Sequence, residues 1–129
     1  MGQKNMIMIV DDNPLDQMIT AQVLRNTYGQ EQIMVMESAA KALAYLRENQ
    51  HDPEAMPALI ILDLDMPEIN GFGFLKQFSE LAEQIKNTCK IVVLTASEQL
   101  EDLQMMQTDP RVAKLIPKPL RKNSLVPVI

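Results

Sequence analysis

Five short, mostly apolar runs recur along the chain and alternate with segments of helical periodicity. They are Met6–Val10, Ile33–Met36, Leu59–Leu62, Ile91–Leu94 and Val112–Ile116. The third run contains no polar residue, which is typical of a strand that is covered on both faces. Strands that alternate with helices predict an α/β fold, with a parallel sheet between two layers of helices. At 129 residues the chain has the usual length of one domain, so a single domain over residues 1–129 is expected.

Capping residues and helical spacing predict four helices between these strands. Asp12, Asn13 and Pro14 mark the start of the first helix, Gly29 marks its end, and Ser38 caps the second. The apolar residues at helical spacing are Leu15, Met18, Ile19 and Val23 in the first helix, Ala39, Ala42, Leu43 and Leu46 in the second, Phe74, Leu75, Phe78, Ala82 and Ile85 in the third, and Leu100, Leu103 and Met106 in the fourth, which starts near Ser97.

The charge balance argues against direct contact with nucleic acid. The chain carries 12 basic and 17 acidic residues, a net charge of −5, and its positive charges are scattered along the sequence. The run Met6–Val10 is too short to span a membrane, and Cys89 is the only cysteine, which fits a reducing compartment. We therefore expect a cytoplasmic protein that binds neither nucleic acid nor membrane, with Cys89 as a small buried apolar residue.

Polar residues directly follow four of the apolar runs. In chain order they are Asp11 and Asp12, Asp63 and Asp65, Thr95 and Ser97, and, after Pro117, Lys118. Ligands of parallel α/β sheets bind beyond the carboxyl ends of the strands, so these residues are expected to converge at one edge. Carboxylates packed this closely raise one another's pKa, and a hard divalent cation such as Mg²⁺ relieves their repulsion. With Lys118 and Thr95 beside the metal, such a site has the groups needed to bind a phosphoryl group.

The same residues belong to four longer strings, which are Asp11-Asp12, the run from Asp63 to Gly71, Thr95-Ala96, and Lys118-Pro119-Leu120. Together these strings resemble the four signatures of a response-regulator receiver domain, in order and over essentially the whole chain. The resemblance implies a flavodoxin-like, doubly wound sheet of five parallel strands in the order 2-1-3-4-5, and a cis bond between Lys118 and Pro119. It also implies a phosphoacceptor of a two-component phosphorelay, which catalyses only its own phosphorylation and dephosphorylation and is otherwise no enzyme.

The resemblance further implies a role for each residue of the predicted site. Asp63 would accept the phosphoryl group from the phosphohistidine of a histidine kinase. Mg²⁺ would be held by Asp11, Asp12, Asp63 and Asp65, and the phosphoryl group by Thr95, Ala96 and Lys118. Asp65 and Ser97 would also adjust the access of water to the phosphoryl group. The implied partners are a sensor histidine kinase or a phosphotransfer protein, and a downstream protein whose binding changes on phosphorylation.

Two features depart from the family pattern. Leu115 stands where receivers often carry Tyr or Phe, so Thr95 and Leu115 are the expected switch positions, but the aromatic part of the switch is replaced. The tail Arg121–Ile129 has room for about two helical turns and contains Pro127, so the last helix is expected to be truncated. Either the chain is part of a longer protein, or the apolar surface left uncovered by a short helix is buried by a partner or by a second copy in a homodimer.

Each of these residues alone has a simpler interpretation, and only their combination supports a phosphoryl site. Asp11-Asp12 alone is more typical of a helix cap, and Lys118 alone is more typical of a solvated surface lysine. A haloacid-dehalogenase-like phosphatase also has an Asp-x-Asp pair, but that pair normally closes the first strand rather than the third. A non-phosphorylated interaction module on the same fold is the other alternative, although such relatives usually lose residues that this chain retains. His51 lies in an expected polar loop without a helical face around it, so no phosphohistidine is expected there.

Overall fold

A five-stranded parallel sheet forms the centre of the computed structural model, which describes residues 6–29, 32–64, 71–81, 88–95, 104 and 111–121. The strand order is β2-β1-β3-β4-β5. The strands are β1 (Ile7–Val10), β2 (Ile33–Met36), β3 (Leu59–Asp63), β4 (Lys90–Thr95) and β5 (Val112–Pro117). The observed order and the parallel pairing of all neighbours confirm the predicted flavodoxin-like sheet, with the five strands within one or two residues of the expected runs.

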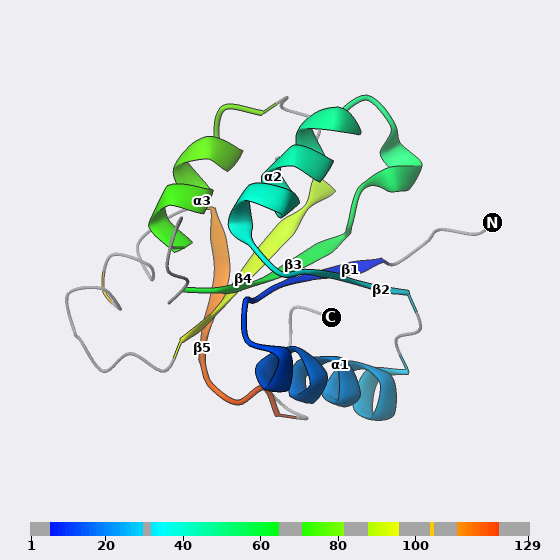
Figure 1. Ribbon diagram of the computed structural model, residues 1–129, viewed down its shortest axis with the longest axis vertical. Helices are drawn as coiled ribbons and strands as arrows, with labels where there is room; N and C mark the ends of the chain where they lie inside the picture. Colours follow the sequence, from blue (N-terminus) through cyan, green and yellow to red (C-terminus); the bar gives the residue numbers. More distant parts are fainter. Residues whose placement is uncertain are drawn as a thin grey trace.

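Helices cover both faces of the sheet, as predicted (Figure 1). Helix α1 (Pro14–Tyr28) lies on one face, while α2 (Ala39–Glu48) and α3 (Gly71–Phe78) lie side by side on the other. A short 3-10 helix, η1 (Pro53–Ala55), precedes β3. The helix expected from Ser97 and the truncated helix expected in the tail lie outside the described residues. Within the described part of the chain, no helix is long and apolar enough to cross a membrane.

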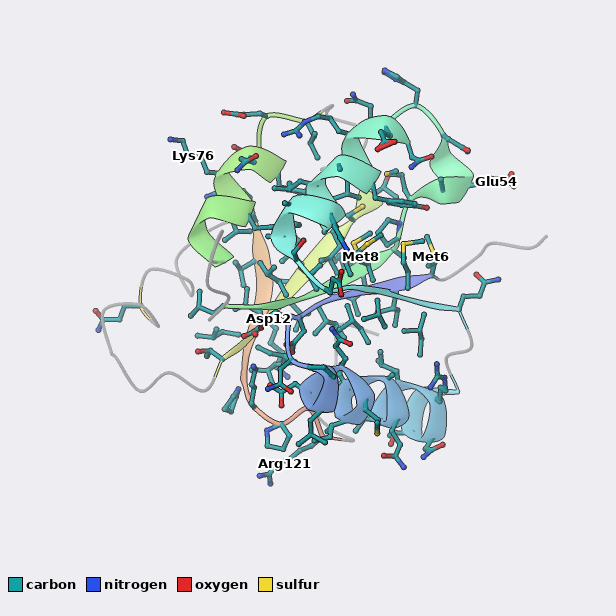
Figure 2. All side chains as sticks on the ribbon, viewed as in Figure 1. Met6, Met8, Asp12, Glu54, Lys76 and Arg121 are labelled. Atoms are coloured by element: carbon teal, nitrogen blue, oxygen red, sulfur yellow. The ribbon has the colours of Figure 1, made fainter. Side chains whose placement is uncertain are left out.

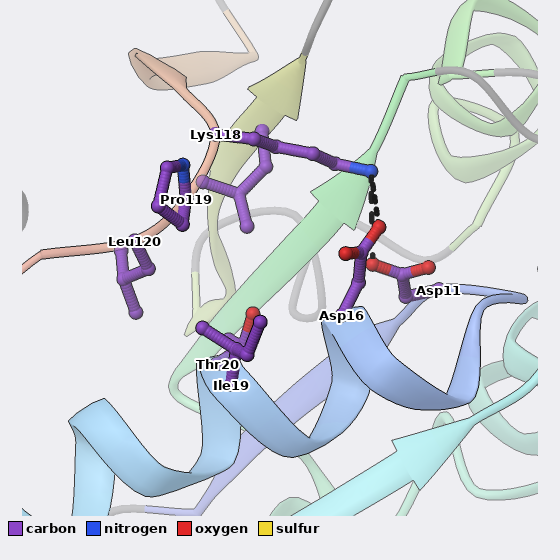
Figure 3. A pocket seen from close by; sticks show the side chains of 8 residues that line it. Asp11, Asp16, Ile19, Thr20, Lys118, Pro119 and Leu120 are labelled. Carbon is purple, nitrogen blue, oxygen red and sulfur yellow. Dashed lines mark hydrogen bonds and ion pairs between the residues drawn. The ribbon is translucent and has the colours of Figure 1, made fainter.

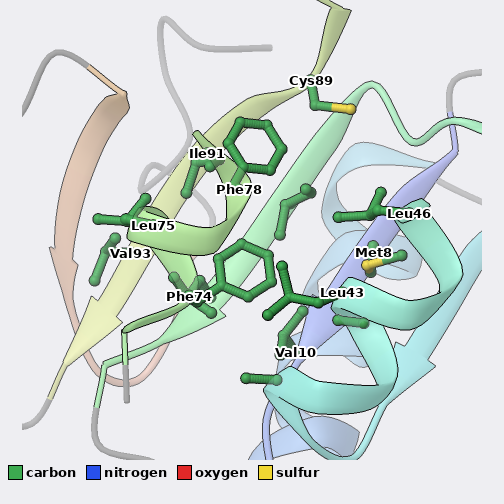
Figure 4. Close-up of a cluster of buried hydrophobic side chains, with 14 of the residues drawn as sticks. Met8, Val10, Leu43, Leu46, Phe74, Leu75, Phe78, Cys89, Ile91 and Val93 are labelled. Carbon is green, nitrogen blue, oxygen red and sulfur yellow. The ribbon is translucent and has the colours of Figure 1, made fainter. Parts of the chain in front are cut away.

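The central strands β1, β3 and β4 are buried because their side chains alternate between two apolar clusters, one on each face of the sheet. Met8 and Val10 of β1 pack toward α2 and α3, in a cluster that includes Leu43 and Phe74 (Figure 4). Ile7 and Ile9 of the same strand pack toward α1, where Leu24 is fully buried. This two-sided cover explains why the strand segments are nearly continuous apolar runs rather than alternating ones.

The inner face of α2 is as predicted, whereas the expected apolar face of α1 is partly wrong. Leu15 and Met18 are 63% and 65% exposed, whereas Thr20, Ala21 and Leu24 of α1 are buried. Gln17 lies one turn before Thr20 and Ala21. Its side-chain amide donates a hydrogen bond to the backbone oxygen of Asp11. Residues three and four positions apart share a helix face, so this contact turns Leu15 and Met18 outward.

Asn13 fixes the start of α1. Its side-chain oxygen accepts hydrogen bonds from the backbone N–H groups of Leu15 and Asp16, at 2.9 and 3.1 Å. We expect Asn13→Ala to lower the free energy of unfolding by about 1 kcal/mol, because two N–H groups lose this partner. Urea denaturation measures the loss. Asn26→Ala, an exposed position on the same helix, is the control and is expected to change stability by less than about 0.5 kcal/mol. Equal effects of the two substitutions would contradict the assigned cap.

Cys89 and the methionines of β1 and β2 lie in the core or pack against it. Cys89 is buried in the cluster beneath α3, and burial raises the pKa of its thiol to about 12. Met8 is fully buried in the same cluster, and Met34 and Met36 of β2 pack against it. A thiol with so high a pKa is a poor nucleophile, so the predicted structural role of Cys89 is confirmed by its burial.

Candidate functional site

The sheet register brings four strand ends to one edge. Asp63, the last residue of β3, is paired with Leu94, and Thr95, the last residue of β4, is paired with Pro117. The backbone N–H of Lys118 then donates to the oxygen of Thr95 at 2.9 Å, and the N–H of Asp11 donates to the oxygen of Met36 at 3.0 Å. The chain therefore leaves β1, β3, β4 and β5 at the same edge, which is where the sequence predicted the site.

Three carboxylates meet at this edge. Asp11, Asp12 and Asp63 each offer an oxygen that lies within 4.8 Å of the others. Asp12 lies where the chain leaves β1 for α1 and is exposed (Figure 2). Asp11 and Asp63 are only 1% and 3% exposed, so two of the three carboxylates have little contact with water. The arrangement joins a buried pair to an exposed third group that faces solvent.

Lys118 extends across the site, where its ammonium reaches the carboxylates of Asp11 and Asp16 (Figure 3). Its Nζ atom lies 3.0 Å from Asp63 Oδ1, 3.0 Å from Asp16 Oδ2 and 3.9 Å from Asp11 Oδ2. The bond between Lys118 and Pro119 is cis, as the resemblance implied. The side chain of Lys118 is 17% exposed, so its ammonium is held largely by carboxylates rather than by water.

The pKa of Asp11 is raised to about 6, first because the carboxyl is buried and then because the charges of Asp63 and Asp16 lie nearby. The backbone N–H of Asn13, which donates to Asp11 Oδ1 at 2.9 Å, and the charge of Lys118 oppose this rise. Burial lowers the pKa of Lys118, but hydrogen bonds to Asp16 and Asp63 outweigh it, so that pKa lies above its usual value. The charge of Lys118 therefore does not fully offset the burial and the neighbouring negative charges that raise the pKa of Asp11.

The donor set fits a divalent cation. Asp11 Oδ2 is fully buried and has no hydrogen-bond partner among the described residues. A buried carboxylate oxygen without a partner costs free energy, and a cation bound at this edge would satisfy it. Carboxylate oxygens are the ligands that hard cations take, so the cluster of Asp11, Asp12 and Asp63 is suited to a divalent metal.

The other predicted residues are described only in part. Thr95 is buried at the end of β4, and Leu115 of β5 is partly buried against the apolar cluster beneath α2 and α3. Asp65, Ala96 and Ser97 lie outside the described residues. His51 is exposed, and no site forms around it in the described part of the chain.

Asp16 and Gln17 were not identified as site residues from the sequence, although both bond to groups of the site. An acidic residue in the first turn of a helix usually indicates only a favourable interaction with the helix dipole. Only their position in the chain could have indicated this role, because α1 begins two residues after Asp12 and its first turn must lie beside the two aspartates.

The sequence profile of the response regulator receiver domain matches residues 7–129, and this match includes every predicted site residue. The chain belongs to this receiver domain family. It is therefore a domain of two-component signalling, and the family match removes the basis for a haloacid-dehalogenase-like phosphatase. Its acidic cluster is compatible with a divalent metal and a phosphoaspartate site.

The receiver domain spans different shares of the proteins that it resembles. Sensor protein TorS of Escherichia coli (strain K12) is 26% identical over 119 residues, which are 92% of this chain but 12% of TorS. A two-component response regulator from Cytophaga hutchinsonii has the same fold, with a TM-score of 0.86, 24% identity, and 96% and 92% of the two chains covered. The phosphorylated cyanobacterial phytochrome response regulator RcpA is similar with a TM-score of 0.76, 26% identity, and 95% and 86% coverage.

Proposed function

We propose that this receiver domain is a phosphoacceptor whose Asp63 takes a phosphoryl group from the phosphohistidine of a sensor histidine kinase or a phosphotransfer protein. The observation that carries the proposal is the surrounding of Asp63. Its Oδ1 lies 3.0 Å from Lys118 Nζ, and carboxylate oxygens of Asp11 and Asp12 lie within 4.8 Å of its own. We further propose that residues 1–129 act as one such domain.

In the proposed reaction, a carboxylate oxygen of Asp63 attacks the phosphorus atom. The new O–P bond forms as the N–P bond of the phosphohistidine breaks, and the imidazole leaves with the electron pair of that bond and takes up a proton. Lys118 places its positive charge beside the attacked group, and the Thr95 hydroxyl donates to a phosphoryl oxygen. Preorganised donors of this kind stabilise the charge that develops in the transition state.

Mg²⁺ is the proposed cofactor, held by Asp11, Asp12 and Asp63, with the backbone oxygen of Asp65 as the further ligand implied by the family resemblance. When bound, it reduces the repulsion between the anionic carboxylate and the anionic phosphoryl group. Mg²⁺ takes few protein ligands and keeps waters that a phosphate can replace. The proposed ligand set meets both needs, since Asp12 is exposed and open to solvent.

Phosphorylation is proposed to change the binding of a downstream protein, by a shift of Thr95 toward the phosphoryl group. Leu115 packs on the apolar cluster and carries no hydroxyl, so its part in the switch would be one of packing. The domain would catalyse only its own phosphorylation and dephosphorylation. A non-phosphorylated interaction module remains the alternative, and the presence of the carboxylates and Lys118 at one edge favours the phosphoacceptor.

Incubation with acetyl phosphate tests the proposal without a kinase. With Mg²⁺ present, we expect the intact mass of the protein to rise by one phosphoryl group, because the donor and metal complete the site. With EDTA in place of Mg²⁺, the mass is expected to stay unchanged. Intact-mass spectrometry measures both. A protein that never gains mass in Mg²⁺ would contradict the phosphoacceptor, and a gain of equal rate in EDTA would contradict the role of the metal.

A further inference from the structure

Among the described residues at this edge, Asp16 is a carboxylate that has no place in the proposed metal set. Its Oδ2 accepts a hydrogen bond from Lys118 Nζ at 3.0 Å, between residues that are 102 positions apart in the chain. Both side chains line a small pocket between α1 and the turn that follows β5 (Figure 3). The side chains of Asp16 and Lys118 are 34% and 17% exposed, so the contact is partly shielded from water.

The position of Asp16 is fixed by the helix that carries it. Asp16 lies in the first turn of α1, where its backbone N–H donates to the Asn13 cap. The next residue, Gln17, bonds the backbone oxygen of Asp11. The first turn of α1 is therefore joined to the site by two side chains in succession. A favourable interaction with the helix dipole explains an acidic residue at this position, but it does not explain a bond to Lys118.

Lys118 needs such an anchor because a lysine side chain is long and flexible. Its ammonium has three donors, and one directed to Asp16 leaves others for Asp63 Oδ1, also at 3.0 Å. A lysine held only by Asp63 would lose its restraint when that carboxylate becomes the attacking group. Asp16 restrains it from a different element, the first turn of α1.

We propose that Asp16 is a positioning residue, which holds the Lys118 ammonium beside Asp63 and so speeds phosphoryl transfer. This inference rests on the proposed function of Asp63. The effect of removing Asp16 on the rate of phosphoryl transfer distinguishes this role from the opposite one. If Asp16 acted mainly by drawing Lys118 away from the phosphoryl group, its removal would speed the transfer, whereas loss of an anchor slows it.

The first test compares Asp16→Ala with Asp16→Asn in the initial rate of phosphoryl uptake from acetyl phosphate at saturating Mg²⁺. Asp16→Ala is expected to slow uptake about tenfold, because the ammonium is no longer held in place. Asp16→Asn keeps an oxygen that accepts from Lys118 and is expected to recover most of the rate. Asp52→Ala, which removes an exposed carboxylate outside the site, is the control. An unchanged or faster rate in Asp16→Ala, or equal losses in both variants, would overturn the proposal.

The second test needs neither phosphoryl donor nor metal. NMR relaxation of the Lys118 side chain in the metal-free protein reports how firmly its end is held. Asp16→Ala is expected to lower the order parameter of the terminal methylene, while Asp16→Asn keeps it near the wild-type value. An order parameter unaffected by Asp16→Ala would overturn the anchor. If the wild type takes up no phosphoryl group, the proposed function fails, while this measurement still decides whether Asp16 restrains Lys118.

Discussion

Asp63→Asn is expected to take up no phosphoryl group from acetyl phosphate under conditions that phosphorylate the wild-type protein. Asparagine fills the same volume and keeps one oxygen near Lys118, so the fold and the local packing are expected to survive. The amide is, however, a much weaker nucleophile than the carboxylate, and it also removes one proposed metal ligand. Intact-mass spectrometry after incubation with the donor and Mg²⁺ measures the loss.

Asp52→Asn is the matched control for this result, because it makes the same chemical change at an exposed carboxylate that follows α2. It is expected to gain mass as the wild type does. Thermal unfolding of the Asp63→Asn variant then shows whether its loss of uptake reflects the nucleophile or the fold. A variant that is folded and still gains a phosphoryl group at the wild-type rate would exclude Asp63 as the acceptor.

The central strands were predictable from the sequence because β1, β3 and β4 are buried on both faces and their interior positions are apolar. The run Leu59–Leu62 needs no tertiary information to be recognised as a strand. The edge strand β2 was also found, although Val35 is 43% exposed there, because its length and β-branched content remained typical. The strand order could not be predicted from the apolar runs, because it depends on which face of the sheet each connecting helix covers. Only the family resemblance supplied it.

The orientation of α1 shows where sequence periodicity loses its power. Leu15, Met18 and Ile19 have the spacing of an inward apolar stripe, yet Leu15 and Met18 face solvent. Polar contacts in the first turn decide the orientation instead, since Gln17 bonds the backbone of Asp11. Such contacts join groups whose proximity exists only after folding. The bond between Asp16 and Lys118 was invisible from the sequence for the same reason.

The predicted site residues could be named from the sequence because parallel strands deliver their carboxyl ends to one edge. That rule places Asp11, Asp63 and Lys118 together without reference to distances. It does not say how deeply each is buried, and burial controls their electrostatics. Asp11 and Asp12 are neighbours in the chain, but only Asp11 is removed from water.

This difference in burial leads to a prediction about stability. Asp11→Asn is expected to raise the free energy of unfolding of the metal-free protein by about 1 to 3 kcal/mol at about pH 7.5, because it removes a buried charge. The upper value follows from the pKa of Asp11, which rises from 3.8 to about 6 on folding. Mg²⁺ is expected to stabilise the wild type and to have much less effect on the variant. Urea denaturation in EDTA and in Mg²⁺ measures both effects.

The stability gained by Asp11→Asn is expected to depend on pH. Because the folded pKa of Asp11 lies above the unfolded one, the folded protein holds a proton that the unfolded chain releases between pH 3.8 and about 6. Stability from this group therefore falls as pH rises through that window, and the full penalty is present above it. The gain from Asp11→Asn over wild type should be largest near neutral pH, about half as large at about pH 5, and absent below the window.

Asp12→Asn separates buried charge from metal binding. Asp12 is exposed, so its substitution removes a proposed ligand without relieving a desolvated carboxylate. We expect this variant to lose stabilisation by Mg²⁺ and to gain no stability in EDTA. If Asp11→Asn proves less stable than wild type in EDTA at neutral pH, the Asp11 charge is stabilised by its surroundings, and the metal is not needed to offset it. If it gains as predicted, the unbound site stores a free-energy cost that a divalent cation removes, which couples metal binding to the stability of the fold.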